Sequence, residues 1–305
     1  MRVVIAAART GGHINPGIAI ANKIKEEEPS SEILFIGTEE GLEKDLVPRA
    51  GYQLKTIEAY GFNRKINITN IKKMVKTFHS QKAARRILKE FAPDVVIGTG
   101  GYICVPVILA ACHLKIKTIL HESNAFPGAS VKFLSAKVDE ILLGFEDAKK
   151  RLPKAKKIVV TGTPTKIEKL ELSDIQKSTI KKQLGLKENL PMVLVFGGSQ
   201  GAKAINEALI SILKNEKNKD YQILWAAGPK QYDRIKEILK EAKIDINRLQ
   251  NGKVVPYIYQ MEEAMNVCDM VIARSGAMTV TEIAKVRETG YIYSIAICDR
   301  KSSGI

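Results

Sequence analysis

Glycine-rich turns follow three of the apolar runs in this sequence, and the first turn carries a histidine. Gly11 and Gly12 end the apolar run that opens the chain, and His13 comes directly after them. The other two turns hold Gly98, Gly100 and Gly101, and Gly197, Gly198 and Gly201. Because a glycine turn before a helix points backbone N–H groups at an anion, three such turns predict a ligand with more than one phosphate group. None of them fits the dinucleotide fingerprint or the P-loop pattern.

Two titratable side chains accompany these turns. His13 stands at the mouth of the first turn. There an imidazole either acts as a general base or as a hydrogen-bond donor to a phosphate, or it caps the following helix. Ser275 and Gly276 open a later helix that contains Glu282, whose carboxylate either accepts both hydroxyls of a ribose or is a solvated helix residue. No D-x-D sequence occurs, which argues against the metal-diphosphate clamp of other sugar transferases, so no metal site is expected.

Alternating elements must position these residues. Apolar runs rich in Val and Ile are separated by amphipathic segments, which is the pattern of a parallel sheet covered by helices on both faces. After a polar stretch that follows residues 162–166 the pattern starts again. We therefore expect two doubly wound, Rossmann-like α/β domains, residues 1–161 and 162–305, with a cleft between them and ligands at the carboxyl ends of the strands.

Composition narrows the class of protein. The 305 residues are 45% hydrophobic, which is enough for two domains with a core each. Four cysteines without C-x-x-C spacing suit reduced thiols in the cytosol. We expect neither a signal peptide nor a membrane span, which needs a run of about 18 apolar residues. The net charge of +15 predicts an anionic partner: nucleic acid, an anionic lipid surface or phosphates.

Five segments, in this order and spacing, resemble the MurG family of cytoplasmic N-acetylglucosamine (GlcNAc) transferases: TGGHINPGIAIA, GTGGY, HESNAFPG, GGSQGAKAIN and RSGAMTVTEIA. The resemblance covers residues 1 to about 285. It implies a GT-B fold and an inverting transfer of GlcNAc from UDP-GlcNAc to the N-acetylmuramic acid (MurNAc) 4-hydroxyl of undecaprenyl-linked lipid I, giving lipid II for peptidoglycan synthesis. It also implies a peripheral position on the cytoplasmic face of the cell membrane, contacts with cell-wall and division proteins, and no cofactor.

The same resemblance implies the site residues, with His13 as the general base. The acceptor is implied to contact residues of the first domain: Thr10, Gly11, Gly12, Gly100, Gly101, Tyr102, Glu122 and Asn124. The donor is implied to contact Lys166, Ser199, Gln200, the Ile258 backbone, Ala277, Met278, Thr279 and, through its ribose, Glu282. Helix N-termini and oriented amides would stabilise the departing UDP in place of a metal.

A basic segment, residues 62–91, holds nine basic residues against one acid. Ile71, Val75 and Phe78 fall on one helical face, which either packs on a core or lies on an anionic bilayer. The polyprenyl acceptor implied by the resemblance favours the bilayer. Nucleic-acid binding is not expected, because no stacking aromatics are interleaved with the basic residues and no recognised module is present.

The sequence departs from the family pattern at several positions. Ala8 and Arg9 stand where glycines are usual, and Arg9 either stiffens the first loop or places a cation beside the acceptor phosphates. Val105 replaces a common glycine, and Lys166 replaces an arginine, which keeps the charge but loses the bidentate fork.

The end of the chain departs most. After about residue 286 the sequence lacks the family's K-P-x-I-x-I-P-x-P and N-H-Q segments, which suitable codons for the same residues can spell when read one base later. We expect a change of reading frame near Val286, an incomplete second domain with an open sheet edge, and impaired transfer.

Two other functions stay open. One is another GT-B glycosyltransferase that acts on a lipid-sugar acceptor, although the GTGGY and HESN segments favour the MurG activity. The other is an inactive remnant that binds the membrane surface or a division complex and has lost transfer.

Overall fold

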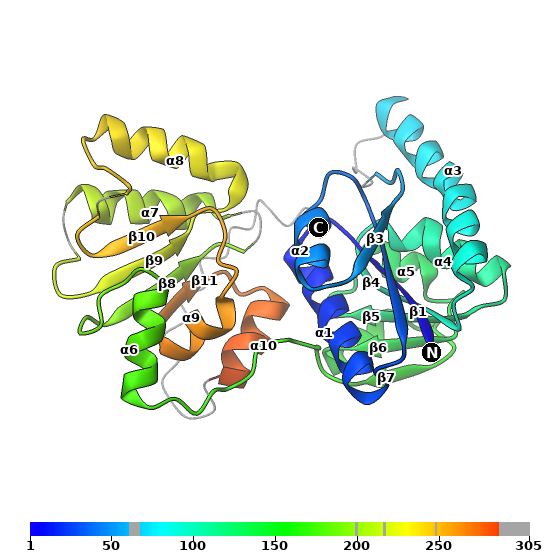
Figure 1. The fold of residues 1–305 in the computed structure, drawn as a ribbon. Helices are drawn as coiled ribbons and strands as arrows, with labels where there is room; N and C mark the ends of the chain where they lie inside the picture. Colours follow the sequence, from blue (N-terminus) through cyan, green and yellow to red (C-terminus); the bar gives the residue numbers. More distant parts are fainter. Residues whose placement is uncertain (61–67, 199–200, 216–217, 248, 287–305) are drawn as a thin grey trace. The chain divides into compact units, whose positions relative to one another are not determined.

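The computed structural model describes residues 1–60, 68–198, 201–215, 218–247 and 249–286 (Figure 1). The chain forms two compact units, Met1–Lys166 and Ile167–Ile305. The division falls after Lys166, a few residues beyond the predicted boundary at 161. Residues 287–305 lie outside the described residues, so the frame change and the incomplete second domain stay predictions.

The first unit is a seven-stranded sheet in which every pair of neighbouring strands is parallel. Its strands are β1 (Arg2–Ala7), β2 (Glu32–Gly37), β3 (Gln53–Thr56), β4 (Val95–Gly100), β5 (Lys117–Glu122), β6 (Glu140–Leu143) and β7 (Ile158–Val160). Their order across the sheet is β3-β2-β1-β4-β5-β6-β7. The central strands are buried on both faces, which explains their continuous Val and Ile runs.

Helices cover both faces of this sheet (Figure 1). They are α1 (Gly11–Glu27), α2 (Glu43–Arg49), α3 (Ile68–Phe91), α4 (Cys104–His113), α5 (Ala129–Leu134) and the 3-10 helix η1 (Glu146–Arg151). A Cβ on Gly17 of α1 would lie 3.1 Å from Ile5 and 3.2 Å from Phe35, so α1 packs closely on that face. On the opposite face, Ala84 and Leu88 of α3 share a core with α4.

The described residues of the second unit repeat the design with four parallel strands. They are β8 (Met192–Phe196), β9 (Gln222–Ala226), β10 (Gly252–Val255) and β11 (Met270–Ala273), in the order β10-β9-β8-β11. The helices are α6 (Asp174–Gln183), α7 (Lys203–Lys214), α8 (Pro229–Glu241), α9 (Met261–Val267) and α10 (Ala277–Val286).

Side chains of β8 alternate between two cores of this unit. Leu194 and Phe196 pack with α9 and α10, whereas Val195 packs with α7, α8 and the fully buried Trp225. This alternation is the period-2 geometry of a strand with helices on both sides. Figure 1 shows α7 and α8 on one side of the sheet and α6, α9 and α10 on the other.

Strand order locates the binding edge of each sheet. In the first unit the order reverses between β1 and β4, and in the second between β8 and β11. Ligands of open α/β sheets bind outside the carboxyl ends of the strands at such a reversal. The turn after β1 and the start of α1 therefore meet the turn after β4, as the glycine positions predict.

The basic helix α3 begins at Ile68 and ends at Phe91. Its described half buries Ala84, Ile87 and Leu88 and exposes Lys82 and Arg85. The side chains of Ile71, Val75 and Phe78 lie outside the described residues, so the bilayer stripe stays a prediction. In the part of the chain that the structure describes, none of the helices combines the length and apolar character needed to cross a membrane.

Candidate active site

A cavity of about 270 Å³ opens at the carboxyl edge of the first sheet, between β1 and β4. It is lined by Arg9, His13, Gly100, Gly101, Tyr102, Glu122, Asn124, Gly128, Ala129, Ser130 and Val131. The structure thus brings together most of the residues predicted for the acceptor. Thr10, Gly11 and Gly12 form the cap and first turn of α1 directly before His13 but do not line the cavity.

The His13 ring lies against the backbone of Gly100. A Cβ on Gly100 would lie 2.3 Å from His13 Nδ1, and the Gly100 φ of 123° is in the region that favours glycine. The Thr99 hydroxyl donates to the His13 carbonyl at 2.7 Å. Burial lowers the pKa of His13, and a hydrogen bond with the Thr99 backbone opposes that effect. The imidazole is therefore neutral at neutral pH and able to accept a proton.

The turn after β4 continues with a second glycine in the left-handed region. Gly101 has a φ of 82°, and a Cβ there would lie 3.2 Å from the Ala8 carbonyl oxygen. Tyr102 follows it, half-buried, and burial raises the pKa of its phenol. Val105, the departure from the family glycine, is buried in α4 and belongs to the apolar core.

Glu122 ends β5 and holds the loop that follows. Its Oε1 accepts from the Asn124 backbone N–H at 2.9 Å and from Asn124 Nδ2 at 2.7 Å. Its Oε2 accepts from the Gly128 N–H, the cap of α5, at 2.8 Å. The carboxylate is buried, and these three donors offset its charge, so Glu122 shapes the wall of the cavity.

A second buried carboxylate, Glu43, does not line the cavity but holds the Arg9 loop at its rim, and it was missed in the sequence. Glu43 Oε2 accepts from the Arg9 N–H at 2.8 Å, and Oε1 accepts from the Thr38 N–H at 2.8 Å and the Thr38 hydroxyl at 2.6 Å. The loops after β1 and β2 are thereby joined. A Cβ on Gly41 would overlap Glu43 Oε2, at 1.8 Å. This contact accounts for the glycine at position 41, but nothing in the sequence distinguishes Glu43 from the other acids around it.

The second unit carries the glycine turn after β8. Gly198 and Gly201 have φ values of 78° and 71°, and a Cβ on Gly197 would lie 2.2 Å from the Ala202 nitrogen. The turn therefore requires its glycines. Ser199 and Gln200 lie outside the described residues, so their donor contacts stay predictions.

The other predicted donor residues are spread over three places. Ile258 is buried in an apolar core, and its predicted backbone contact with uracil stays a prediction. Met278 and Glu282 are buried one turn apart on α10, and Ala277 and Thr279 are partly exposed at its start. Lys166 is exposed at the end of the first unit. The described residues contain no group of three or more side chains suited to a metal ion.

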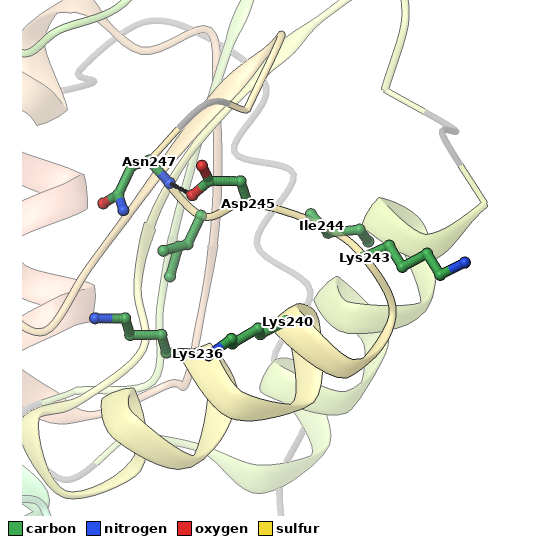
Figure 2. A pocket seen from close by; sticks show the side chains of 7 residues that line it. Lys236, Lys240, Lys243, Ile244, Asp245 and Asn247 are labelled. Carbon is green, nitrogen blue, oxygen red and sulfur yellow. Dashed lines mark hydrogen bonds between the residues drawn. The ribbon is translucent and has the colours of Figure 1, made fainter.

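A cavity of about 400 Å³ in the second unit lies away from these residues (Figure 2). It is lined by Lys236, Lys240, Lys243, Ile244, Asp245, Ile246 and Asn247. Figure 2 shows Lys236 and Lys240 on α8 and the Asn247 N–H donating to Asp245, a bond of 2.9 Å. Because α8 starts after the carboxyl end of β9, its last turn lies toward the amino ends of the strands. No residue predicted for the donor lines this cavity.

Two doubly wound α/β units with glycine turns at the carboxyl edges of their sheets make up a GT-B fold. Models of the glycosyltransferase family 28 N-terminal and C-terminal domains match residues 3–143 and 192–290. A relative from Acetivibrio thermocellus is 43% identical over 284 residues, 93% of this chain and 75% of the relative. It is named UDP-N-acetylglucosamine--N-acetylmuramyl-(pentapeptide) pyrophosphoryl-undecaprenol N-acetylglucosamine transferase. The chain belongs to this family, the MurG family.

Further similarities agree with this assignment. A relative of the same name from Caldanaerobacter subterraneus is 43% identical over 286 residues, 94% of this chain and 77% of the relative. The crystal structure of Acinetobacter baumannii MurG has a TM-score of 0.57 and 27% identity, covering 93% of this chain and 76% of that one. A UDP-GlcNAc 2-epimerase from Neisseria meningitidis has a TM-score of 0.57 at 14% identity, covering 91% and 78%, and shares the fold alone.

Proposed function

We propose that the chain transfers GlcNAc from UDP-GlcNAc to the MurNAc 4-hydroxyl of lipid I and so forms lipid II of peptidoglycan synthesis. The observation that carries this proposal is the identity of 43% to a transferase of that name along both units. The cavity beside His13 supports it, because a neutral imidazole stands at the binding edge of the sheet where the acceptor is predicted to bind.

In the proposed reaction, residues of the first unit act on the acceptor and residues of the second unit bind the donor. His13 accepts the proton of the acceptor hydroxyl while the oxygen of that hydroxyl bonds to C1 of GlcNAc. The bond from C1 to UDP breaks on the opposite face of C1, and UDP leaves. The turn of Gly197, Gly198 and Gly201 leads into α7, whose first backbone N–H groups bind the diphosphate as it takes up the negative charge. Glu282 holds the ribose. These roles are proposals carried by the family pattern and by the position of each residue in its sheet.

The purified 305-residue chain tests the proposal. We expect radiolabelled product from UDP-GlcNAc and a short-chain lipid I analogue, and His13→Asn should lower kcat about 100- to 10,000-fold. His113→Asn is the matched control, because His113 is an exposed histidine of the same unit on the far end of α4.

Binding measurements distinguish a chain that has the proposed function but transfers slowly from a chain that lacks this function. Equilibrium binding of both substrates with slow turnover agrees with the impaired transfer predicted from the altered tail, and robust turnover shows that prediction to be wrong. A chain that binds neither substrate contradicts the proposed function. Transfer to diacylglycerol, but not to lipid I, would instead favour the other GT-B activity.

We also propose that α3 places the enzyme on the anionic cytoplasmic face of the membrane. Its described half exposes Lys82, Arg85, Arg86 and Lys89 while burying Ala84 and Leu88 on the other face. Each basic residue near such a surface contributes about 1 kcal/mol.

Vesicle sedimentation tests this position. Lys82→Glu combined with Arg86→Glu should weaken binding to vesicles rich in phosphatidylglycerol at least about tenfold. Lys236→Glu combined with Lys240→Glu on α8 makes the same change in charge and should have a smaller effect. Equal effects of the two pairs would show that net charge, and not α3, governs the binding. Division and cell-wall proteins remain proposed partners on the family pattern alone.

A further inference from the structure

Arg9 adopts a backbone conformation that an arginine rarely takes. Its φ is 79°, in the left-handed region, where a side chain clashes with the backbone and glycine is the usual residue. The conformation is held by the hydrogen bond from the Arg9 N–H to Glu43 Oε2 at 2.8 Å. That bond uses the backbone, so the loop would form at least as well with glycine. Strained residues of this kind cluster at functional sites.

The Arg9 side chain lies in the wall of the cavity. It is exposed, and its guanidinium carbon lies 5.9 Å from the centre of the Tyr102 ring. A cation at this distance is attracted by the ring face, which keeps the guanidinium beside the turn after β4. The arginine is therefore not part of the core and belongs to the lining of the cavity.

Arg9 is also the one formally positive side chain among the described residues that line this cavity. Burial lowers the pKa of His13, which leaves that ring neutral at neutral pH. Glu122 is the corresponding negative side chain, and three N–H donors already offset its charge. Glu43, the buried carboxylate nearest Arg9, likewise accepts three hydrogen bonds. An anionic group that enters beside Tyr102 therefore meets the Arg9 guanidinium next to two carboxylates that are already hydrogen-bonded.

We propose that Arg9 binds the diphosphate of the lipid-linked acceptor and is a specificity residue of this chain. The inference rests on the proposed function for the identity of the acceptor. A guanidinium offers two parallel N–H donors that match phosphate oxygens, which a glycine at this position cannot. Arg9 thus adds a side-chain contact at a place where the family pattern has only backbone.

Kinetics of Arg9 variants test the contact. Arg9→Gln should raise the KM for the acceptor about 10- to 100-fold and leave the KM for UDP-GlcNAc unchanged, and Arg9→Lys should recover part of the loss. An acceptor with an uncharged linker in place of the diphosphate should be used equally well by the wild type and Arg9→Gln. An equal loss with both acceptors would overturn the proposal.

Stability measurements separate recognition from folding. Arg9→Gly relieves the left-handed strain, so its unfolding midpoint should rise while acceptor binding weakens. Lys115→Gly is the matched control, since Lys115 has a φ of 57° in the loop between α4 and β5. It should raise the midpoint without changing the acceptor KM. A purely structural arginine would show no such opposition between stability and binding.

A binding probe keeps this inference distinct from the proposed function. Inorganic pyrophosphate should shift the amide resonances of Gly100 and Gly101 in the full chain, and Arg9→Gln should abolish these shifts. If the wild type binds pyrophosphate here but binds neither UDP-GlcNAc nor lipid I, the proposed function fails and the anion site stands. If the shifts are absent, or equal in the variant, the role of Arg9 is wrong even when lipid II forms.

Discussion

Replacing Gly100 by alanine tests the contact that holds His13 in the cavity. The new Cβ would lie 2.3 Å from His13 Nδ1, closer than side-chain atoms approach in folded proteins, and the φ of 123° is itself unfavourable for alanine. The backbone contributes about 1–2 kcal/mol of destabilisation. Crowding of a packed site adds about 1–3 kcal/mol. We therefore expect Gly100→Ala to lose about 2–5 kcal/mol and to displace the imidazole.

Gly51→Ala is the matched control for the backbone contribution. Gly51 has a φ of 83° with nothing within 4 Å of a Cβ, so it should lose only about 1–2 kcal/mol. Unfolding in urea followed by far-UV circular dichroism reports both units, whereas the single tryptophan, Trp225, reports the second. The fluorescence midpoint of both variants should match the wild type.

A double-mutant cycle identifies the partner in the clash. Adding His13→Ala to Gly100→Ala should recover the crowding part of the loss, because the ring that meets the Cβ is gone. Two results would refute this reasoning: Gly100→Ala no less stable than Gly51→Ala, or no recovery in the double variant. Either would show that His13 does not lie against Gly100 in solution.

Three further predictions concern buried polar groups. Glu43→Ala should lower the free energy of unfolding by about 3–5 kcal/mol, measured in urea, because three hydrogen bonds from two loops end on this buried carboxylate; an effect below about 1 kcal/mol would contradict it. Asn206→Leu should destabilise the second unit by about 2–4 kcal/mol and shift the Trp225 emission, since its amide joins the indole N–H at 3.0 Å to the Ala227 carbonyl at 3.0 Å. The pKa of His13 is lowered from 6.5, so the folded state binds fewer protons than the unfolded state. The contribution of His13 to the free energy of unfolding is therefore fully present above pH 6.5 and is lost as the pH falls from there toward the folded pKa. His13→Gln should flatten that part of the pH profile of unfolding, and an unchanged profile would show that the His13 pKa is not lowered.

Local patterns were sufficient to predict the elements and the binding edge. Runs of Val and Ile between amphipathic segments predicted parallel sheets, and the GT-B fold is confirmed. The glycines after β1 and β4 predicted turns at one edge because parallel strands end together, and His13, Gly100 and Gly101 do line one cavity. This part of the site could be predicted because it follows from the parallel direction of the strands.

Long-range contacts of single polar atoms could not be predicted. The bond from the Arg9 N–H to Glu43 joins residues 34 positions apart, and Glu43 stands among other acids in TEEGLEKD with no pattern to distinguish it. Glu122 was predicted as an acceptor contact, and its identity gave no sign that three donors of its own loop surround it. Such contacts are determined by tertiary packing, which brings together residues that are far apart in the sequence.

The carboxylates of Glu43 and Glu122 fix the shape of the cavity through backbone contacts, independently of the side chains that line it. Glu43 and Glu122 accept hydrogen bonds from the backbone N–H groups of Arg9 and Gly128, and every residue except proline has a backbone N–H. Residues that tolerate a left-handed backbone can therefore replace Arg9, during evolution or in a designed library, while the rim keeps its outline. A cavity built in this way can acquire a new substrate preference by single substitutions, without first having to evolve a new loop.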